Sequence, residues 1–83
     1  MRILYFAWLR ERLGKTSEEL TLPPGIETPR AVIDWLRGLN PVYIAAFTDL
    51  NLIRCAVNQE FCGLDTKFEA AAEIAFFPPV TGG

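Results

Sequence analysis

The chain contains no histidine, the residue that most often serves as a general base or binds zinc in proteins. Catalysis by a Ser–His or Cys–His pair is therefore excluded. Neither a P-loop nor a G-x-G-x-x-G motif occurs, so no nucleotide-binding fingerprint is present. We expect no catalytic residue and no metal site of the chain's own.

Basic residues are also few. The 8 Lys and Arg stand against 10 Asp and Glu, for a net charge of −2, and they form no cluster. Nucleic-acid binding through phosphate neutralisation is therefore not expected. No apolar run approaches the roughly 18 residues of a transmembrane helix. We accordingly expect a cytoplasmic protein that does not act in a membrane.

Apolar residues are abundant by contrast. They make up 51% of 83 residues, with 22% charged, which excludes intrinsic disorder and allows a single domain. A domain of this size buries only about 60–65% of the surface that its unfolded chain exposes. Part of the apolar content must therefore remain at the surface, which points to a partner protein.

The first half of the chain predicts two strands and two helices. A strand is expected over residues 2–6 and a short helix over 7–13, with Gly14 just past its end. A half-exposed strand follows over 18–22. Its neighbouring Glu18 and Glu19 should point to opposite faces, and we expect both to be solvated.

The main helix has a clear start. Thr28 suits the N-cap, and Pro29 suits the first helical position. Apolar residues at helical spacing predict an amphipathic helix that lies on a core and ends near residues 38–40. Residues 41–50 suggest a further helical turn or two.

The last third predicts three strands, over residues 52–57, 60–64 and 73–77, with a tight turn at Asn58–Gln59. This turn would place Cys55 opposite Cys62. A disulfide between them is geometrically conceivable, but in a reducing cytoplasm we expect two thiols that pack as small hydrophobes. The element order predicts an α+β fold, in which a mixed sheet of about five strands packs on one main helix with one or two short helices.

The end of the chain carries the most informative motif, F-F-P-P-V-T-G-G. The two prolines should end the last strand and direct the tail away from the sheet. Gly82 and Gly83 lack side chains, so the tail could thread a narrow channel and present its carboxylate to a buried site. The alternative is a frayed terminus. Activation with ATP as an acyl-adenylate would let that carboxyl form a thiocarboxylate with sulfur, or an amide bond with an amine.

The sequence resembles the small subunits of molybdopterin synthase, the MoaD type, over essentially its whole length. The resemblance rests on the opening Ile3–Ala7 with Leu9–Glu11, on the hairpin Ala56–Glu60 and above all on Glu73–Gly83. One departure is visible, because Glu69–Glu73 replaces the Asp-Gly-Asp-like turn that usually precedes the last strand.

The resemblance implies a ubiquitin-like β-grasp domain over residues 1–79 and a flexible tail over 80–83. A MoeB-like enzyme would adenylate Gly83 with ATP, and a sulfurtransferase or cysteine desulfurase would supply the sulfur of a thiocarboxylate. The tail, Thr81, Gly82 and Gly83, would enter a MoaE-like large subunit and sulfurate cyclic pyranopterin monophosphate to build the molybdopterin dithiolene. The subunits would form a heterotetramer, and no cofactor would be bound permanently.

We assign the partner interface to the residues that lead into the tail: Phe76, Phe77, Pro78, Pro79 and Val80. Neighbours on a strand cannot share a face, so one phenylalanine should join the core while the other meets the partner. Three alternative functions stay open. They are sulfur delivery to a thiazole or to tRNA, a ubiquitin-like modifier joined to lysines, and an interaction domain with an inert tail.

Overall fold

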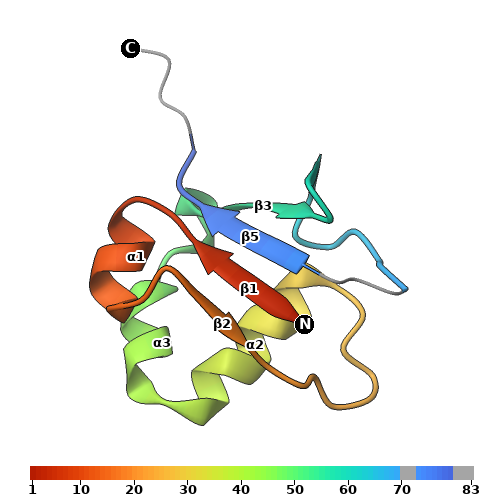
Figure 1. Ribbon diagram of the computed structural model, residues 1–83, viewed down its shortest axis with the longest axis horizontal. Helices are drawn as coiled ribbons and strands as arrows, with labels where there is room; N and C mark the ends of the chain where they lie inside the picture. The colour runs from red at the N-terminus through yellow and green to blue at the C-terminus, as the bar shows by residue number, and fades with distance from the viewer. Residues whose placement is uncertain (70–72, 80–83) are drawn as a thin grey trace.

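A mixed five-stranded sheet forms the centre of the computed structural model, which describes residues 1–69 and 73–79 (Figure 1). The strand order across the sheet is β2-β1-β5-β3-β4. Strands β1 and β5 run parallel, and the other neighbours run antiparallel. The elements, in chain order, are β1 (Arg2–Tyr5), α1 (Trp8–Leu13), β2 (Ser17–Glu19), α2 (Pro29–Leu39), α3 (Pro41–Ala46), the 3₁₀ turn η1 (Leu50–Leu52), β3 (Arg54–Val57), β4 (Glu60–Cys62) and β5 (Glu73–Phe77).

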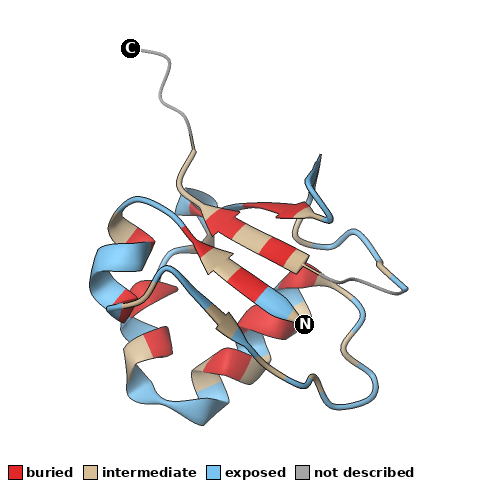
Figure 2. Ribbon diagram, viewed as in Figure 1, coloured by how far each residue is buried: buried red, intermediate tan, exposed pale blue. Residues whose placement is uncertain are grey.

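The core lies between the sheet and the helices. Along β5 the burial alternates, with Ile74 and Phe76 fully buried and the other three residues only partly so (Figure 2). On α2 the buried residues are Pro29, Val32, Ile33 and Leu36. The predicted α+β architecture, with one main helix on a mixed sheet, is thus confirmed.

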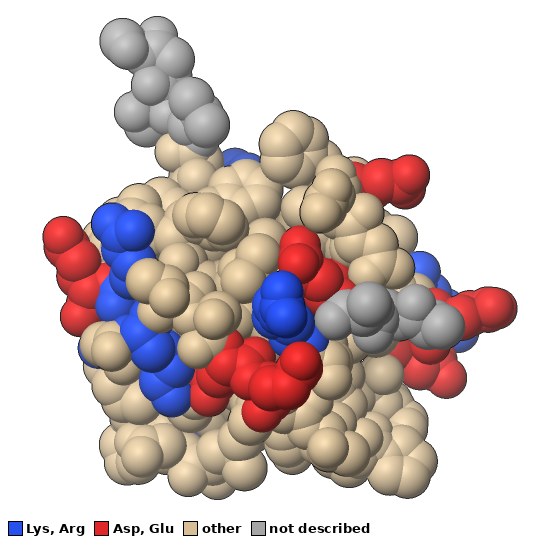
Figure 3. Space-filling view, viewed as in Figure 1, with Lys and Arg blue, Asp and Glu red and all other residues tan. Residues whose placement is uncertain are grey.

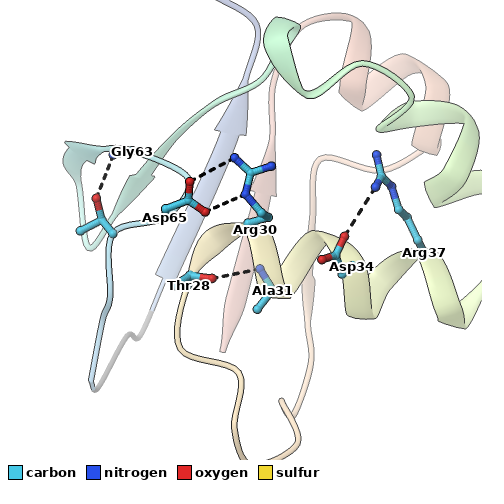
Figure 4. A network of polar contacts seen from close by, with 8 residues as sticks. Thr28, Arg30, Ala31, Asp34, Arg37, Gly63 and Asp65 are labelled. Atoms are coloured by element: carbon cyan, nitrogen blue, oxygen red, sulfur yellow. Dashed lines mark hydrogen bonds and ion pairs between the residues drawn. The ribbon is translucent and has the colours of Figure 1, made fainter.

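Helix α2 begins and ends as predicted. The Thr28 hydroxyl accepts a hydrogen bond from the Ala31 amide at 3.1 Å, as an N-cap does (Figure 4). The predicted extra helical turns after Asn40 are α3 and η1. Among the described residues, no helix has the length and apolar character needed to cross a membrane.

Four strands end or begin short of the prediction, and β1 does so by one residue, at Tyr5. Strand β2 ends at Glu19, although the Leu20 amide still donates to the Met1 carbonyl at 2.9 Å. Leu20 packs against the edge of the core and so is apolar without being part of the strand. Strand β3 begins at Arg54 because η1 occupies the preceding residues, and β4 ends at Cys62 instead of residue 64.

Glu18 corrects the expectation of a solvated carboxylate. Its position opposite Ile3 puts the side chain on the helix side of the sheet. The carboxylate accepts hydrogen bonds from the hydroxyls of Tyr5 and Tyr43, each at 2.6 Å, and from Lys15 Nζ at 3.0 Å. The Glu18 side chain is only 14% exposed. The cluster ties β1, β2 and α3 together.

The electrostatics of this cluster predict an acid-sensitive fold. Burial of Glu18 by itself would raise its pKa, but the hydrogen bonds from Tyr43, Tyr5 and Lys15 outweigh it and lower the pKa below the ordinary value. A lowered pKa in the folded state adds stability at neutral pH. That stability falls away once the pH drops below the unfolded-state pKa of about 4.3 and through the folded-state pKa.

We therefore expect Glu18→Gln to cost about 1–2 kcal/mol of unfolding free energy at pH 7 and little at pH 3. Urea denaturation of both proteins across this pH range measures the difference. Glu19→Gln is the matched control, because Glu19 is the exposed neighbour on the opposite face. A Glu18→Gln deficit that stays constant with pH would contradict the role of the charge.

Candidate functional site: an open apolar sheet face

The face of the sheet opposite α2 carries a row of apolar side chains. The strand register aligns Leu4 of β1 with Ala75 of β5, Ala75 with Ala56 of β3, and Ala56 with Phe61 of β4. The row thus crosses four adjacent strands.

A second row lies beside it at the carboxyl end of β5. Phe77 pairs with Arg54, and the backbone bond from the Phe6 amide to the Phe76 carbonyl, at 3.2 Å, brings Phe6 level with Phe77. We call the six apolar residues of the two rows the open face: Leu4, Phe6, Ala56, Phe61, Ala75 and Phe77.

The open face exposes large aromatic rings to solvent. Phe61 is 85% exposed and Phe6 is 46% exposed. The rings of Phe61 and Phe77 lie 5.6 Å apart, and a shallow hollow of about 200 Å³ lies beside them. Figure 3 shows the upper part of this face largely free of charge, next to basic side chains over α1. An exposed apolar patch with a charged border is typical of a protein-binding surface.

The backbone beside Phe6 is strained. Ala7 has φ 55° and ψ −133°, a conformation that is costly for any residue except glycine, by about 1–3 kcal/mol. Here the chain leaves β1 and turns into α1 while Phe6 stays beside Phe77. The strain therefore lies at the border of the open face.

Phe76 and Phe77 divide as the strand pattern predicts. Phe76 is fully buried and packs edge-on against Phe47, with ring centroids 5.4 Å apart. Its assignment to a partner interface is therefore wrong, because its position on the helix side of β5 leaves it no access to a partner. Phe77 lies on the open face, half-buried, and Pro78 and Pro79 follow it directly.

The predicted tail residues lie outside the described residues: Val80, Thr81, Gly82 and Gly83. The unusual turn at residues 70–72 does too. The described part of the chain nevertheless places β5 in the middle of the sheet and ends it beside the open face.

The sequence interpretation missed Phe6 and Phe61. The face on which Phe61 lies could have been predicted from the hairpin register. A two-residue turn at Asn58–Gln59 sets Phe61 opposite Ala56, on the face of Phe77. Nothing local marks Phe61 as exposed, because an apolar residue in a short strand ordinarily predicts burial.

The described residues contain no group of three or more Cys, Asp and Glu side chains able to hold a metal ion. The densest polar cluster, around Glu18, is tied up in its own hydrogen bonds on the helix side of the sheet. What the site offers chemically is an apolar docking surface next to the end of β5.

Comparison with known proteins adds a family match. The model of the ThiS family matches residues 3–83. The sulfur carrier subunit of molybdopterin synthase from Escherichia coli K12 is 32% identical over 83 residues, covering 100% of this chain and 99% of the relative. Its counterpart from Dictyostelium discoideum is 36% identical over 84 residues, covering 99% and 94%.

Solved structures share the fold. Small archaeal modifier protein 1 from Haloferax volcanii superposes with a TM-score of 0.73 at 27% identity, covering 96% of this chain and 97% of the other. A putative molybdopterin converting factor subunit 1 from Pyrococcus furiosus gives a TM-score of 0.66 at 22% identity, covering 95% of each. The first is a ubiquitin-like β-grasp protein, and the predicted β-grasp fold is confirmed.

Proposed function

The chain belongs to the ThiS family, and from this premise we propose that it is the sulfur-carrier subunit of a molybdopterin synthase. The observation that carries the proposal is similarity at 32–36% identity to three such subunits along nearly the whole chain. The closing F-F-P-P-V-T-G-G motif supports it, because a carrier needs a slender terminal segment that reaches into a partner.

The reactive group in this proposal is the carboxyl of Gly83. A terminal carboxylate with a pKa near 3.5 is ionised at pH 7 and is a poor electrophile. A MoeB-like enzyme would join it to AMP from ATP, with release of pyrophosphate. Sulfur delivered by a sulfurtransferase would then displace AMP and leave a thiocarboxylate. ATP is consumed by the activating enzyme, and the carrier itself holds no cofactor.

The open face would dock the carrier on its partners. In the proposed complex, a MoaE-like large subunit covers the open face and receives Thr81, Gly82 and Gly83 in its active site. There the thiocarboxylate would pass sulfur to cyclic pyranopterin monophosphate. A chain without histidine fits a non-catalytic subunit, with the acid–base groups supplied by the large subunit.

The proposal is tested by the intact mass of the protein after incubation with its activating enzyme, ATP and a sulfur source. We expect a mass gain equal to the difference between one sulfur and one oxygen atom, located in the C-terminal peptide. The control omits ATP. An unchanged mass with a competent enzyme preparation would overturn the carrier proposal.

A second candidate is a ubiquitin-like modifier. It is favoured by the fold match to the Haloferax volcanii modifier protein. In that case the activated carboxyl would form amide bonds to lysines, and tagged protein would appear in a ladder of larger conjugates in cells. Delivery of sulfur to a thiazole or to tRNA is distinguished by the partner, since only the molybdopterin pathway requires a pterin-binding large subunit.

Phe61 tests the docking role of the open face. We expect Phe61→Ala to change the unfolding free energy by less than about 0.5 kcal/mol, because the ring is almost wholly exposed. Binding to the large subunit should weaken about 10- to 30-fold, as expected for an aromatic anchor. Isothermal titration calorimetry measures the affinity.

Ile44→Ala is the matched control for this measurement. Ile44 is 54% exposed on α3, away from the open face, so its truncation should leave the affinity unchanged. Equal effects of the two substitutions would contradict docking through the open face.

A further inference from the structure

Cys55 and Cys62 face each other across the β3–β4 hairpin. Their Sγ atoms are 3.8 Å apart, and the Cys55 thiol donates to the Cys62 carbonyl at 3.3 Å. Both thiols are free. Opposed residues of antiparallel strands have Cα atoms about 4.5–5.5 Å apart, within the range of about 4.4–6.8 Å that disulfides span. We propose that these cysteines form a thiol–disulfide exchange site for a small anionic disulfide, independent of the C-terminal tail.

The two thiols differ in access. Cys55 is 2% exposed, whereas Cys62 is half-buried. Burial first, and then the nearby Cys62, raise the pKa of Cys55 to about 12, so Cys55 is the poorer initial nucleophile. Cys62 is therefore the residue that meets the small molecule, and Cys55 resolves the adduct.

A hollow of about 480 Å³ is lined by both cysteines, a size that suits a small-molecule ligand. The residues that line it include two arginines, Arg30 and Arg54. Arg30 is held by Asp65, with contacts of 2.7 and 3.2 Å (Figure 4).

The positive charge of Arg54 is less neutralised than that of Arg30. Arg54 donates to the backbone carbonyls of Asn51 and Ile53, at 3.1 Å each, and takes part in none of the ion pairs between described residues. Because Arg54 lines the same hollow as the two cysteines, its positive charge favours a small disulfide that carries carboxylates.

The atoms and electrons of this thiol–disulfide exchange balance with the two cysteines and one small disulfide alone. The Cys62 thiolate attacks one sulfur of the small disulfide, whose S–S bond breaks and releases one thiolate. The Cys55 thiolate then attacks Cys62 Sγ, a bond between the two cysteines forms, and a second small thiol leaves. The protein thiols are oxidised by two electrons, the small disulfide is reduced by two, and the two thiol protons end on the products.

The consequence of the bond is local. Strand β4 is an edge strand of three residues, and within the described ranges 1–69 and 73–79 its one strand neighbour is β3. It carries Phe61 next to Cys62. Closing the Sγ–Sγ distance from 3.8 Å to about 2.05 Å would fix this edge to β3. Oxidation would thus slow the opening of the hairpin that presents Phe61.

The test treats the reduced full-length chain with oxidised glutathione and follows intact mass with peptide mapping. We expect the native protein to lose two hydrogen atoms and keep no adduct. Cys55→Ala should accumulate one glutathione on Cys62, and Cys62→Ala should not react. A lasting adduct on the native protein, or an adduct on Cys62→Ala, would overturn the site. Rapid alkylation of native protein during the reaction shows the order of attack without any variant.

The charge of the ligand is tested separately with Arg54→Gln. This substitution should slow the reaction with oxidised glutathione severalfold and leave that with cystamine, a cationic disulfide, no slower. Equal slowing of both would overturn the preference for an anionic ligand. Hydrogen exchange of the β4 amides should slow on oxidation, and unchanged exchange would overturn the effect on the hairpin. None of these readouts depends on sulfur transfer through Gly83.

Discussion

Deletion of Gly83 is expected to abolish thiocarboxylate formation and cofactor synthesis while leaving the fold unchanged. The deletion moves the terminal carboxyl back by one residue, about 3.3–3.6 Å. A displacement of even 1 Å from productive geometry costs about 100-fold in rate. One residue added after Gly83 should be as damaging, because it moves the carboxyl too far forward. The effect on turnover should therefore exceed about 100-fold in both directions.

Two measurements separate the effect of tail length on sulfur transfer from any effect on the stability of the fold. The buried core of the described chain lies between Ile3 and Phe76, so the melting temperature should not change on deletion. Gly83→Ala keeps the carboxyl in register and adds only a methyl group, so it should retain more activity than either length variant. Sulfur transfer that survives the deletion would exclude Gly83 as the carrier site.

The last third of the fold was predictable because its signals are local. A tight turn at Asn58–Gln59 requires positive φ, and the structure has 49° and 69° there. That turn alone fixes the register of β3 against β4, including the pairing of Cys55 with Cys62. The two-residue period of a strand predicts that Phe76 and Phe77 lie on opposite faces, but it does not say which of them is buried.

Glu18 was not predictable because its partners are distant in the sequence. Tyr5 lies 13 residues before it and Tyr43 lies 25 residues after it. A glutamate next to another glutamate ordinarily indicates a solvated strand edge, and the hydrogen bonds from Tyr5 and Tyr43 in the folded structure show otherwise. Burial of a charge is stable here because three donors satisfy one carboxylate.

The full extent of the open face was not predictable either, because it also depends on residues that are distant in the sequence. The high apolar content indicated that some apolar surface must face a partner, and the interpretation assigned it to the residues around the tail. The structure extends that surface across the sheet to Phe6 and Phe61, which are far apart in the sequence. The strand order brings Phe6 and Phe61 onto one surface with Phe77. That order depends on the parallel pairing of β1 with β5, which no local turn specifies.

Phe76→Ala and Phe77→Ala should give opposite results although the residues are adjacent. Phe76 is fully buried against Phe47, so its truncation removes core contacts and leaves a cavity, at a cost of about 3–5 kcal/mol. That is a large share of the roughly 5–15 kcal/mol that stabilises a small domain. Phe77 lies on the open face, and its truncation should cost less than about 1 kcal/mol of folding free energy.

For partner binding we expect the reverse ranking, in which substitution of Phe77 is the more damaging. Phe77→Ala should weaken binding to the large subunit about 10- to 100-fold. Phe76→Leu, which keeps an apolar side chain in the core and folds more readily than Phe76→Ala, should bind nearly as well as the native chain. Urea denaturation gives the stabilities and calorimetry the affinities. If Phe76→Leu lost affinity as strongly as Phe77→Ala, the partner would be sensing the core of the domain, and the open face would not be its docking surface.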